Sequence, residues 1–296
     1  DEAGVDPWRD VLTKEQFREK FGVITHPFTG VDYIDFYTSL IEGEGAQCQV
    51  LLANRTRAKA EALAAQLEEQ GAAVAVAENP GVAEEADYIF LGVKPQMMAD
   101  MLESIAPVLA ARDRDGRRFV LVTMAAGLTI ARIREMAGAD YPVIRIMPNT
   151  PCAIGKGMIL CAAHGVTEEE KTAFCEGMAA AGRLDWLEEH LIDAGSAVSG
   201  CGPAFAYLFM EALADGAVEC GLPRAKALEY AAQTLAGAAG LVLESGQHPG
   251  ALKDAVCSPG GSTIAGVHAL ENGAFRATAI NAVAAAYEKT RALGKS

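Results

Sequence analysis

The sequence predicts an α/β domain followed by a domain built only from helices. The chain has 296 residues, which is enough for two domains that each bury their own core. Between residues 48 and 162, short continuous apolar runs alternate with helical stretches, a pattern typical of a parallel sheet covered on both faces. After about residue 190 no strand pattern remains. We therefore expect an α/β domain over 21–165, a mainly helical domain over 166–296 and an N-terminal extension over 1–20.

The expected elements follow the chain in order. A helical patch is expected around 8–21, a short strand at 20–24 and a helix-like segment at 31–42. Further strands are expected at 48–53, 73–76, 88–93, 119–124, 143–147, 157–162 and 184–187. The helices between them are expected at 57–70, 80–86, 95–111, 129–137 and 167–181. The helices of the second domain are expected at 203–220, 224–244, 250–256, 263–271 and 275–293.

One of these helices indicates an oligomer. Between its charged ends, the stretch 224–244 is almost entirely Ala, Gly, Leu and Val. A helix that is apolar on all sides is buried on all sides, and a domain of about a hundred residues has little room for such a helix. We therefore expect an intertwined homodimer; the alternative is the central helix of a monomeric bundle.

Composition limits the possible partners. The net charge of −14 argues against nucleic acid or an anionic membrane, because both need a basic face. No apolar run reaches the ~20 residues of a membrane span, and the first residues lack the basic-then-apolar order of a signal peptide. The seven cysteines are dispersed, which suits a reducing cytoplasm, and the five histidines lack metal-ligand spacing. We expect a cytoplasmic protein without a metal.

The stretch Cys257-Ser258-Pro259-Gly260-Gly261-Ser262-Thr263 is a candidate binding site. A proline and two glycines form a tight turn that opens an apolar helix. Unpaired N–H groups and the positive dipole end of such a helix can hold an anion such as a carboxylate. The hydroxyl groups of Ser258, Ser262 and Thr263 add donors and acceptors. The alternative interpretation is an ordinary helix start with Ser262 or Thr263 as the N-cap.

Four loops follow predicted strands and should lie together, because ligands of a doubly wound sheet bind at the carboxyl ends of its strands. They are Asn54-Arg55-Thr56, Val93-Lys94-Pro95-Gln96, 124–129 and 147–151. In a dinucleotide-binding domain, Arg55 could pair with a 2′-phosphate and favour NADP over NAD. Each loop also has a plain structural interpretation: a solvated arginine, a proline at a first helical turn, and Thr129 as a helix cap.

Taken together, these segments resemble the pyrroline-5-carboxylate reductases. The matching residues include Asn54-Arg55-Thr56, Val93-Lys94-Pro95-Gln96, Ala125-Ala126-Gly127, 145–151, 199–204, 211–216, 221–224, His248-Pro249, 257–266 and 268–271. The resemblance implies an oxidoreductase of proline biosynthesis that reduces 1-pyrroline-5-carboxylate to L-proline. It also implies a Rossmann-like domain binding NADPH, with NADH possible, and an all-helical domain that forms an interlocked homodimer. Rings of five dimers, a decamer, are common in that family.

The resemblance also assigns residues to roles. It places Asn54, Arg55 and Asn79 at the adenosine end of the cofactor, and Val93, Lys94 and Pro95 along its middle. Ala125, Gly127, Pro148 and Asn149 border the nicotinamide. The substrate carboxylate and ring nitrogen are assigned to Ser258, Gly260, Gly261, Ser262 and Thr263, with the Thr263 hydroxyl as the catalytic partner of the nitrogen.

One segment departs from the family pattern. Where the family has a Gly-x-Gly-x-x-Gly turn over the pyrophosphate, this chain has Thr25-His26-Pro27-Phe28-Thr29-Gly30. Pro27 has no N–H to donate to a phosphate. The segment could bind the cofactor in an unusual way, or its sequence could be altered relative to the functional enzyme. Two further hypotheses are a non-catalytic homologue that binds proline or a related imino acid, and a reductase of another imine or keto acid.

Overall fold

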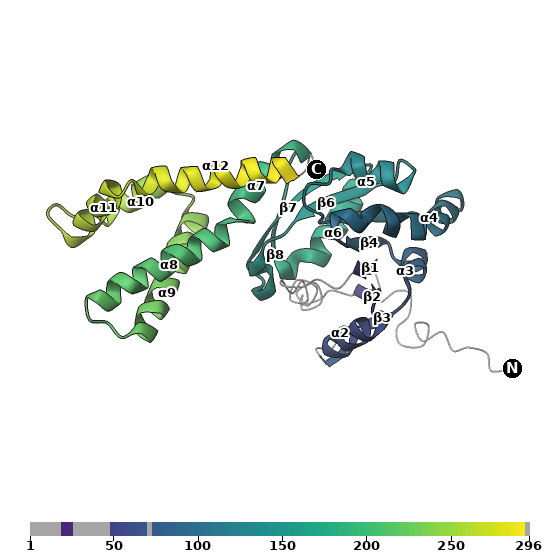
Figure 1. Cartoon of the computed structure of the whole chain (residues 1–296), viewed down its shortest axis with the longest axis horizontal. Helices are drawn as coiled ribbons and strands as arrows, with labels where there is room; N and C mark the ends of the chain where they lie inside the picture. The colour runs from purple at the N-terminus through teal and green to yellow at the C-terminus, as the bar shows by residue number, and fades with distance from the viewer. Residues whose placement is uncertain (1–18, 26–47, 70–72, 294–296) are drawn as a thin grey trace. The chain divides into compact units, whose positions relative to one another are not determined.

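The computed structural model of the chain describes residues 19–25, 48–69 and 73–293 (Figure 1). It forms two compact units, an α/β unit that ends at Gly200 and a helical unit over Cys201–Glu288, with the residues from Lys289 onward grouped with the first. The expectations for residues 1–18, for the segment 31–42 and for His26–Gly30 lie outside the described residues.

The α/β unit is built on one sheet of eight strands in the order β3-β2-β1-β4-β5-β6-β7-β8. The strands from β1 to β6 pair in parallel, as the continuous apolar runs predicted. Their bounds are β1 Glu19–Thr25, β2 Cys48–Asn54, β3 Ala73–Val76, β4 Tyr88–Gly92, β5 Val120–Thr123, β6 Val143–Met147, β7 Gly157–His164 and β8 Gly182–Trp186.

The expectation of a wholly parallel sheet is wrong at β7. This strand runs antiparallel to β6, with Val143 opposite His164 and Met147 opposite Leu160. Only residues 148–156 join the two strands. A parallel connection needs a crossover of about a dozen residues or more, so this short link turns the chain back instead.

The α/β unit extends beyond the expected boundary at residue 165. β8 pairs in parallel with β7, and α6 (Glu168–Met178) buries Phe174 and Met178 against the sheet. A further helix that the sequence analysis does not contain, α7 (Ile192–Ser199), buries Ile192 and Ala197. The segment 166–200 therefore belongs to the sheet domain.

Side-chain alternation along the strands creates two cores, one on each face of the sheet. In β2, Val50 and Leu52 face the core that contains α2 and α6, whereas Leu51 and Ala53 face the core that contains α3, α4 and α5. The helix bounds are α2 Arg57–Glu69, α3 Asn79–Glu85, α4 Met98–Arg114 and α5 Ile130–Ala137, with 3-10 turns at Pro95–Met97, Thr150–Ile154, Ala179–Ala181 and Glu189–Leu191. The expected helices of this unit are confirmed to within a few residues.

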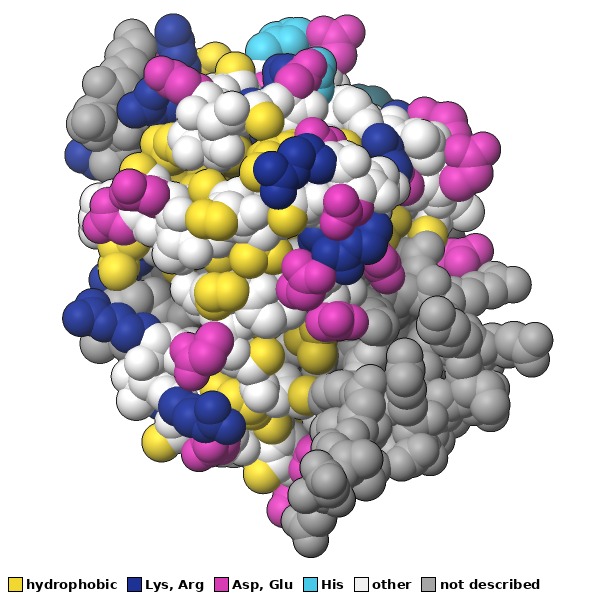
Figure 2. Space-filling model, turned by 90° about the vertical axis from the view of Figure 1, so that its right-hand side faces the viewer, with side chains coloured by type: hydrophobic (Ala, Val, Ile, Leu, Met, Phe, Trp, Pro, Cys, Tyr) yellow, Lys and Arg dark blue, Asp and Glu magenta, His cyan; other side chains and the backbone are white. Residues whose placement is uncertain are grey.

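The surface of this unit carries charges of both signs. Figure 2 shows Lys and Arg side chains interspersed with Asp and Glu over the face that it presents. Some of them pair across elements: Arg118 of the loop before β5 pairs with Glu170 of α6, and Arg117 pairs with Glu84 of α3. Exposed pairs of this kind contribute little stability individually.

The helical unit contains α8 (Gly202–Glu219), α9 (Arg224–Ser245), α10 (Pro249–Ala255), α11 (Ser262–Asn272) and most of α12 (Phe275–Leu293), as predicted. α8 and α9 lie side by side as a hairpin. The buried side chains of the unit are Ala214, Ala227 and Ala231, whereas many large apolar side chains are exposed. These exposed side chains include Phe205, Tyr207, Leu208, Leu213, Leu228, Tyr230, Leu241, Leu243, Val256 and Ile280. The unit thus leaves most of its apolar surface outside its own core.

Gly157, the first residue of β7, packs so closely on the neighbouring 3-10 turns that a side chain would not fit there. A Cβ atom on Gly157 would lie 2.1 Å from the Cys152 sulfur and 2.7 Å from the Ala181 carbonyl oxygen. We expect Gly157→Ala to lower the free energy of unfolding by about 3 kcal/mol, since backbone must move to make room.

Gly81→Ala, in α3, is the matched control, because its Cβ would meet only Ala77 at 3.4 Å. Alanine favours helix over glycine by up to ~1 kcal/mol, so the control should be neutral or stabilising. Urea unfolding measures the free energy of unfolding of both variants. Equal values for Gly157→Ala and Gly81→Ala would contradict the close packing at Gly157.

Candidate functional site

The carboxyl ends of the parallel strands define one candidate site. β2, β4, β5 and β6 end at Asn54, Gly92, Thr123 and Met147, and parallel pairing places these ends at one edge of the sheet. β2 and β3 lie on one side of β1 in the sheet, and the chain then crosses to the other side of β1 for β4, β5 and β6. Such a reversal opens a crevice at the carboxyl ends, where doubly wound sheets bind their ligands.

At the end of β2, a local turn presents Arg55. The Asn54 side-chain oxygen accepts a hydrogen bond from the Thr56 N–H at 2.8 Å, which fixes the turn before α2. Arg55 is exposed, and the neighbouring Arg57 is paired with Glu61 at 2.8 Å. Arg55 directly follows the last residue of β2, so it lies at the carboxyl end of that strand, where a doubly wound sheet binds its ligand.

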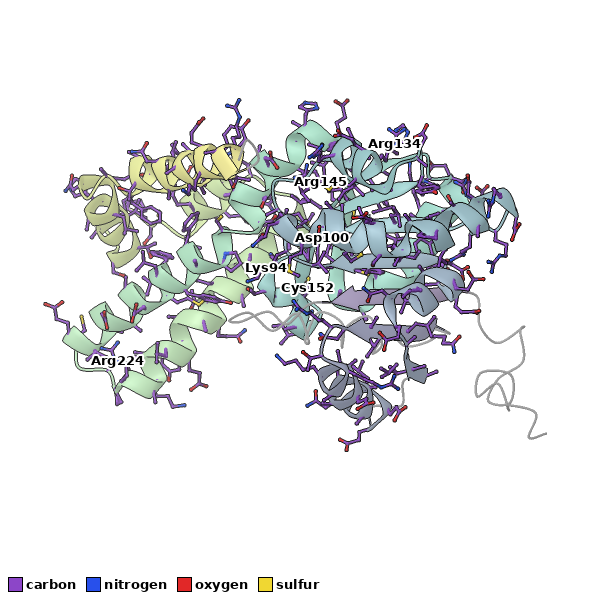
Figure 3. All side chains as sticks on the ribbon, turned by 45° about the vertical axis from the view of Figure 1, so that its right-hand side comes forward. Lys94, Asp100, Arg134, Arg145, Cys152 and Arg224 are labelled. Atoms are coloured by element: carbon purple, nitrogen blue, oxygen red, sulfur yellow. The ribbon has the colours of Figure 1, made fainter. Side chains whose placement is uncertain are left out.

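The two neighbouring loops add further predicted residues to this edge. Asn79, half-buried, opens α3 after β3. After β4, Val93 is buried at 6 % exposure, Lys94 is half-buried in extended backbone, and Pro95 starts the 3-10 turn (Figure 3). Proline is favoured at such a first position because its missing N–H has no partner to lose.

The loop after β5 is small and leads into a capped helix. Ala125 is buried and Gly127 has φ of +79°, a left-handed conformation that favours glycine. The Thr129 hydroxyl accepts a hydrogen bond from the Arg132 N–H at 3.2 Å, so its predicted role as the N-cap of α5 is confirmed. The Glu189 carboxylate accepts a second hydrogen bond, from the Ile130 N–H at 2.7 Å.

Arg145 in β6 is a buried residue to whose side chain the sequence assigns no role. It lies in the α/β unit (Figure 3), is 3 % exposed, and pairs with Asp193 at 2.9 Å and with Glu189 at 3.3 Å. The signal in the sequence is a lone arginine within the apolar strand Val143–Met147. A buried cation needs such partners, because an unpaired charge in the core is strongly destabilising.

The loop after β6 is rigidly held. The Asn149 side chain donates to the Ser199 carbonyl oxygen at 3.0 Å and accepts from the Met158 N–H at 2.9 Å. The amide group predicted to border the nicotinamide is thus used to hold α7 and β7. Nearby, burial raises the pKa of the Cys152 thiol, which disfavours a nucleophilic thiolate there.

The turn before α11 is the second candidate site and lies in the helical unit. Gly260 has φ of +70°, and the Gly261 N–H donates to the Ser258 carbonyl oxygen at 3.0 Å. A Cβ on Gly261 would lie 2.4 Å from the Ser258 hydroxyl oxygen. The two glycines therefore make the turn possible.

The alternative interpretation, in which Ser262 or Thr263 caps α11, is wrong. The N-cap residue is Gly261, and no side chain makes a capping hydrogen bond at this described helix end. Glycine has no side chain to offer, so the first N–H groups of the helix are not covered by a capping side chain. Ser262 and Thr263 are exposed in the first turn beside them. This arrangement favours the anion-binding interpretation.

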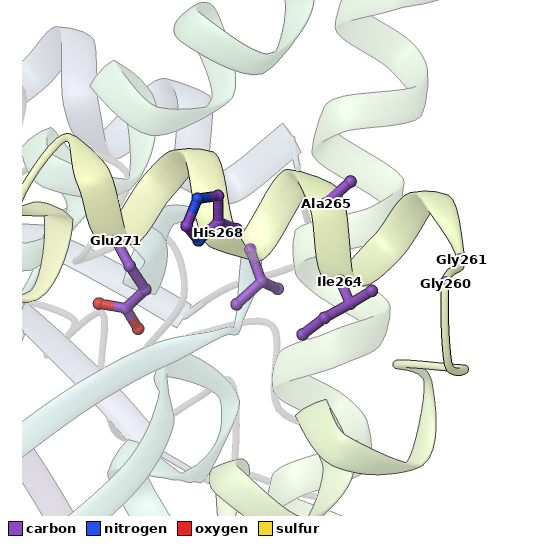
Figure 4. A pocket seen from close by; sticks show the side chains of 7 residues that line it. Gly260, Gly261, Ile264, Ala265, His268 and Glu271 are labelled. Carbon is purple, nitrogen blue, oxygen red and sulfur yellow. The ribbon is translucent and has the colours of Figure 1, made fainter.

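A hollow lies along the same helix. It has a volume of about 520 Å³ and is lined by Gly260, Gly261, Ile264, Ala265, Val267, His268 and Glu271. Figure 4 shows these residues along α11, following the turn. Among the described residues, no group of three His, Cys, Asp or Glu could hold a metal ion.

Comparison with known proteins identifies the family. Residues 189–293 match the family model "Pyrroline-5-carboxylate reductase dimerisation", and residues 37–126 match "NADP oxidoreductase coenzyme F420-dependent". The chain is 44 % identical to pyrroline-5-carboxylate reductase of Glycine max over 73 % of this chain and 76 % of that protein. It is 42 % identical to the Escherichia coli K12 enzyme, over 73 % and 78 %. The chain belongs to the pyrroline-5-carboxylate reductase family.

Solved structures of the pyrroline-5-carboxylate reductase family share the fold. The Coxiella burnetii reductase matches with a TM-score of 0.81 and 28 % identity, covering 94 % of this chain and 99 % of that one. The Plasmodium falciparum reductase, solved with NADP bound, matches with a TM-score of 0.75 and 28 % identity over 94 % and 98 %. The predicted Rossmann-like domain and helical second domain are thus confirmed.

In this member of the reductase family, the structure groups the predicted residues in two places. The residues predicted to bind cofactor lie in loops at the carboxyl ends of β2 to β6, whereas Ser258 to Thr263 form one turn of the helical unit. The described cofactor loops fit a dinucleotide: an exposed arginine, a half-buried lysine and a small loop of Ala125 and Gly127 follow successive strands.

The cap of α5 predicts how firmly the Ala125–Gly127 loop is held. We expect Thr129→Ala to lower the free energy of unfolding by about 1 kcal/mol, because the Arg132 N–H loses its acceptor. Thr129→Ser keeps the hydroxyl and is the control. Chemical unfolding measures both variants; a serine variant as unstable as the alanine variant would contradict the capping role.

Proposed function

We propose that this chain reduces 1-pyrroline-5-carboxylate to L-proline with NADPH as the hydride donor. The observation that carries the proposal is 42–44 % identity to curated pyrroline-5-carboxylate reductases over 73 % of the chain. The strand order of the α/β unit and the helix start of α11, which no side chain caps, support the proposal.

The cofactor would lie along the carboxyl edge of the sheet. Asn54, Arg55 and Asn79 would hold its adenosine end, where the positive charge of Arg55 favours a 2′-phosphate and hence NADPH over NADH. The middle would meet Val93, Lys94 and Pro95, and the nicotinamide would meet Ala125, Gly127, Pro148 and the Asn149 backbone. When bound, the cofactor supplies the hydride that the C=N carbon accepts.

The turn before α11 would hold the substrate. The N–H groups at the start of α11 and the hydroxyl groups of Ser258 and Ser262 suit the carboxylate, because the helix dipole favours an anion there. The Thr263 hydroxyl would contact the ring nitrogen. A protonated imine is the better hydride acceptor, and solvent would supply that proton, since no strong general acid is assigned to this turn.

The helical unit supports a homodimer. Its large apolar side chains stay exposed, and the family model that matches 189–293 describes dimerisation. Among the described residues, one segment, Glu189–Glu219, is long and apolar enough to cross a membrane by length and composition. We propose that a second copy of the chain covers this surface, because the segment lies within the matched dimerisation region.

A cytoplasmic location fits the thiol chemistry. Cys152, Cys161, Cys175, Cys201, Cys220 and Cys257 are free. Free thiols persist in a reducing compartment.

The functional test is turnover of 1-pyrroline-5-carboxylate by the full chain, followed as NADPH consumption. We expect Thr263→Ala to lower kcat at least ~tenfold while the Kd for NADPH changes little, because a transition-state contact to the nitrogen is lost. Thr263→Ser keeps the hydroxyl and should retain most of the activity. Equal losses in kcat and NADPH affinity would contradict the role of Thr263.

A fluorescence titration with NADPH separates the competing hypotheses. Tight binding together with turnover means that the Thr25–Gly30 segment is compatible with the cofactor. A folded protein that binds proline but not NADPH would favour the non-catalytic homologue.

The dimer proposal predicts the mass in solution. We expect a dimer or a multiple of dimers by light scattering, which also distinguishes a dimer from a decamer. Leu243→Asp on α9, where Leu243 is 72 % exposed, should shift the protein toward smaller species, because a charge would be buried in the interface.

The control is Gln233→Asp, an exposed polar position on the same helix. A monomeric wild-type protein at micromolar concentration would contradict the proposal.

A further inference from the structure

β6 and the loop that follows it hold α7 at both of its ends. Arg145 of β6 pairs with Asp193 in the first turn of α7, and Asn149 donates to the carbonyl oxygen of Ser199, the last residue of α7. The partners are 48 and 50 residues apart along the chain. α7 is only eight residues long, so these two attachments fix both its position and its direction.

The attachment at the start of α7 is a charge cluster with little freedom. Arg145 is 3 % exposed, and its guanidinium spans Asp193 at 2.9 Å and Glu189 at 3.3 Å. Among the described residues its Nε has no hydrogen-bond partner, so the two carboxylates carry the pairing of this buried cation. Moving α7 would leave a buried charge unpaired, which is costly.

At the C-terminal end of α7, the side-chain amide of Asn149 both donates and accepts a hydrogen bond. Asn149 accepts from the Met158 N–H of β7 at 2.9 Å while it donates to Ser199 at 3.0 Å. A buried or half-buried amide with both groups satisfied has one preferred orientation. The loop Pro148–Asn149, proposed to border the nicotinamide, is thereby joined to the C-terminal end of α7.

The chain leaves the α/β unit directly from this point. Gly200 (φ −78°, ψ −43°) and Cys201 (φ −88°, ψ −25°) keep right-handed helical backbone, and α8 starts at Gly202. The Gly200 N–H donates to the Ser196 carbonyl oxygen at 2.8 Å. Gly200 is the last residue of the α/β unit before the helical unit begins at Cys201, so α7 is the last helix of the α/β unit before that boundary.

We propose that Asn149, together with the Arg145–Asp193 pair, is a positioning element: it couples the loop proposed to border the nicotinamide to α7 of the same unit. This inference rests on the proposed function. Hydride transfer depends steeply on the alignment of donor and acceptor, and a displacement of ~1 Å can cost ~100-fold in rate. Loss of the coupling should therefore reduce kcat far more than it reduces binding of either ligand.

Asn149→Asp tests the coupling with a side chain of the same size. The aspartate keeps an oxygen for the Met158 N–H, but it cannot donate to the Ser199 carbonyl oxygen and places a negative charge beside it, so that hydrogen bond is lost. We expect kcat to fall about tenfold or more, with the Kd for NADPH and the KM for pyrroline-5-carboxylate within about threefold of wild type. Asp193→Asn should change the same parameters in the same direction.

Amide hydrogen exchange supplies a readout that does not depend on activity. Faster exchange at 196–201 in Asn149→Asp, with unchanged exchange in β4 and β5, is expected. Ser199→Ala is the matched control, because it removes the bond from the Ser199 hydroxyl to Gly195 while the backbone acceptor stays. If wild type turns over no pyrroline-5-carboxylate, the proposed function fails, and the exchange data still test the coupling.

A second variant disturbs the same place without touching Asn149. A Cβ on Gly200 would lie 2.9 Å from both the Ser196 carbonyl and hydroxyl oxygens, so Gly200→Ala should reproduce the loss of kcat. Two results would overturn the inference: a loss of NADPH affinity in Asn149→Asp as large as its loss of kcat, or unchanged kcat and unchanged exchange in both variants.

Discussion

The constraint on which the structure depends is that the helical unit cannot bury its own apolar surface. Between Cys201 and Glu288, a stretch that is described throughout, the buried side chains are those of Ala214, Ala227 and Ala231. The α/β unit, in contrast, closes one core on each face of its sheet. A unit with so little internal burial lacks the hydrophobic free energy needed to stay folded alone.

The two candidate sites are formed in different ways. In the α/β unit, parallel pairing places the carboxyl ends of the strands at one edge of the sheet. Loops that are far apart in the sequence therefore lie at the same edge. In the helical unit, two glycines and an uncapped helix start create local donors for an anion. The first site depends on topology and the second on a single turn.

The sequence predicts the element positions well, because apolar runs and turn residues are local signals. The parallel order from β1 to β6 also follows from them, since strands buried on both faces read as continuous apolar runs. The direction of β7 does not, because a strand's periodicity is the same in either direction and only the short link 148–156 decides it. The sequence does not predict α7, because its eight residues include Gly195 and two serines, which weaken a helical pattern.

Site residues divide in the same way. Asn54, Thr129 and Gly261 act through partners within three residues along the chain, so their roles can be anticipated from local sequence. The carboxylate partners of Arg145 and the Ser199 partner of Asn149 are 44 to 50 residues away, and only the fold brings them together. The sequence shows a charged residue in an apolar strand but not the carboxylates that neutralise it.

The central claim is that this chain transfers a hydride from NADPH to the imine carbon of pyrroline-5-carboxylate. The most direct measurement is mass spectrometry of the product after reaction with NADPH deuterated at the transferred position of the nicotinamide. The account predicts L-proline that carries the deuterium at the former imine carbon. Proline without deuterium, or no proline from a folded protein that binds both ligands, would contradict it.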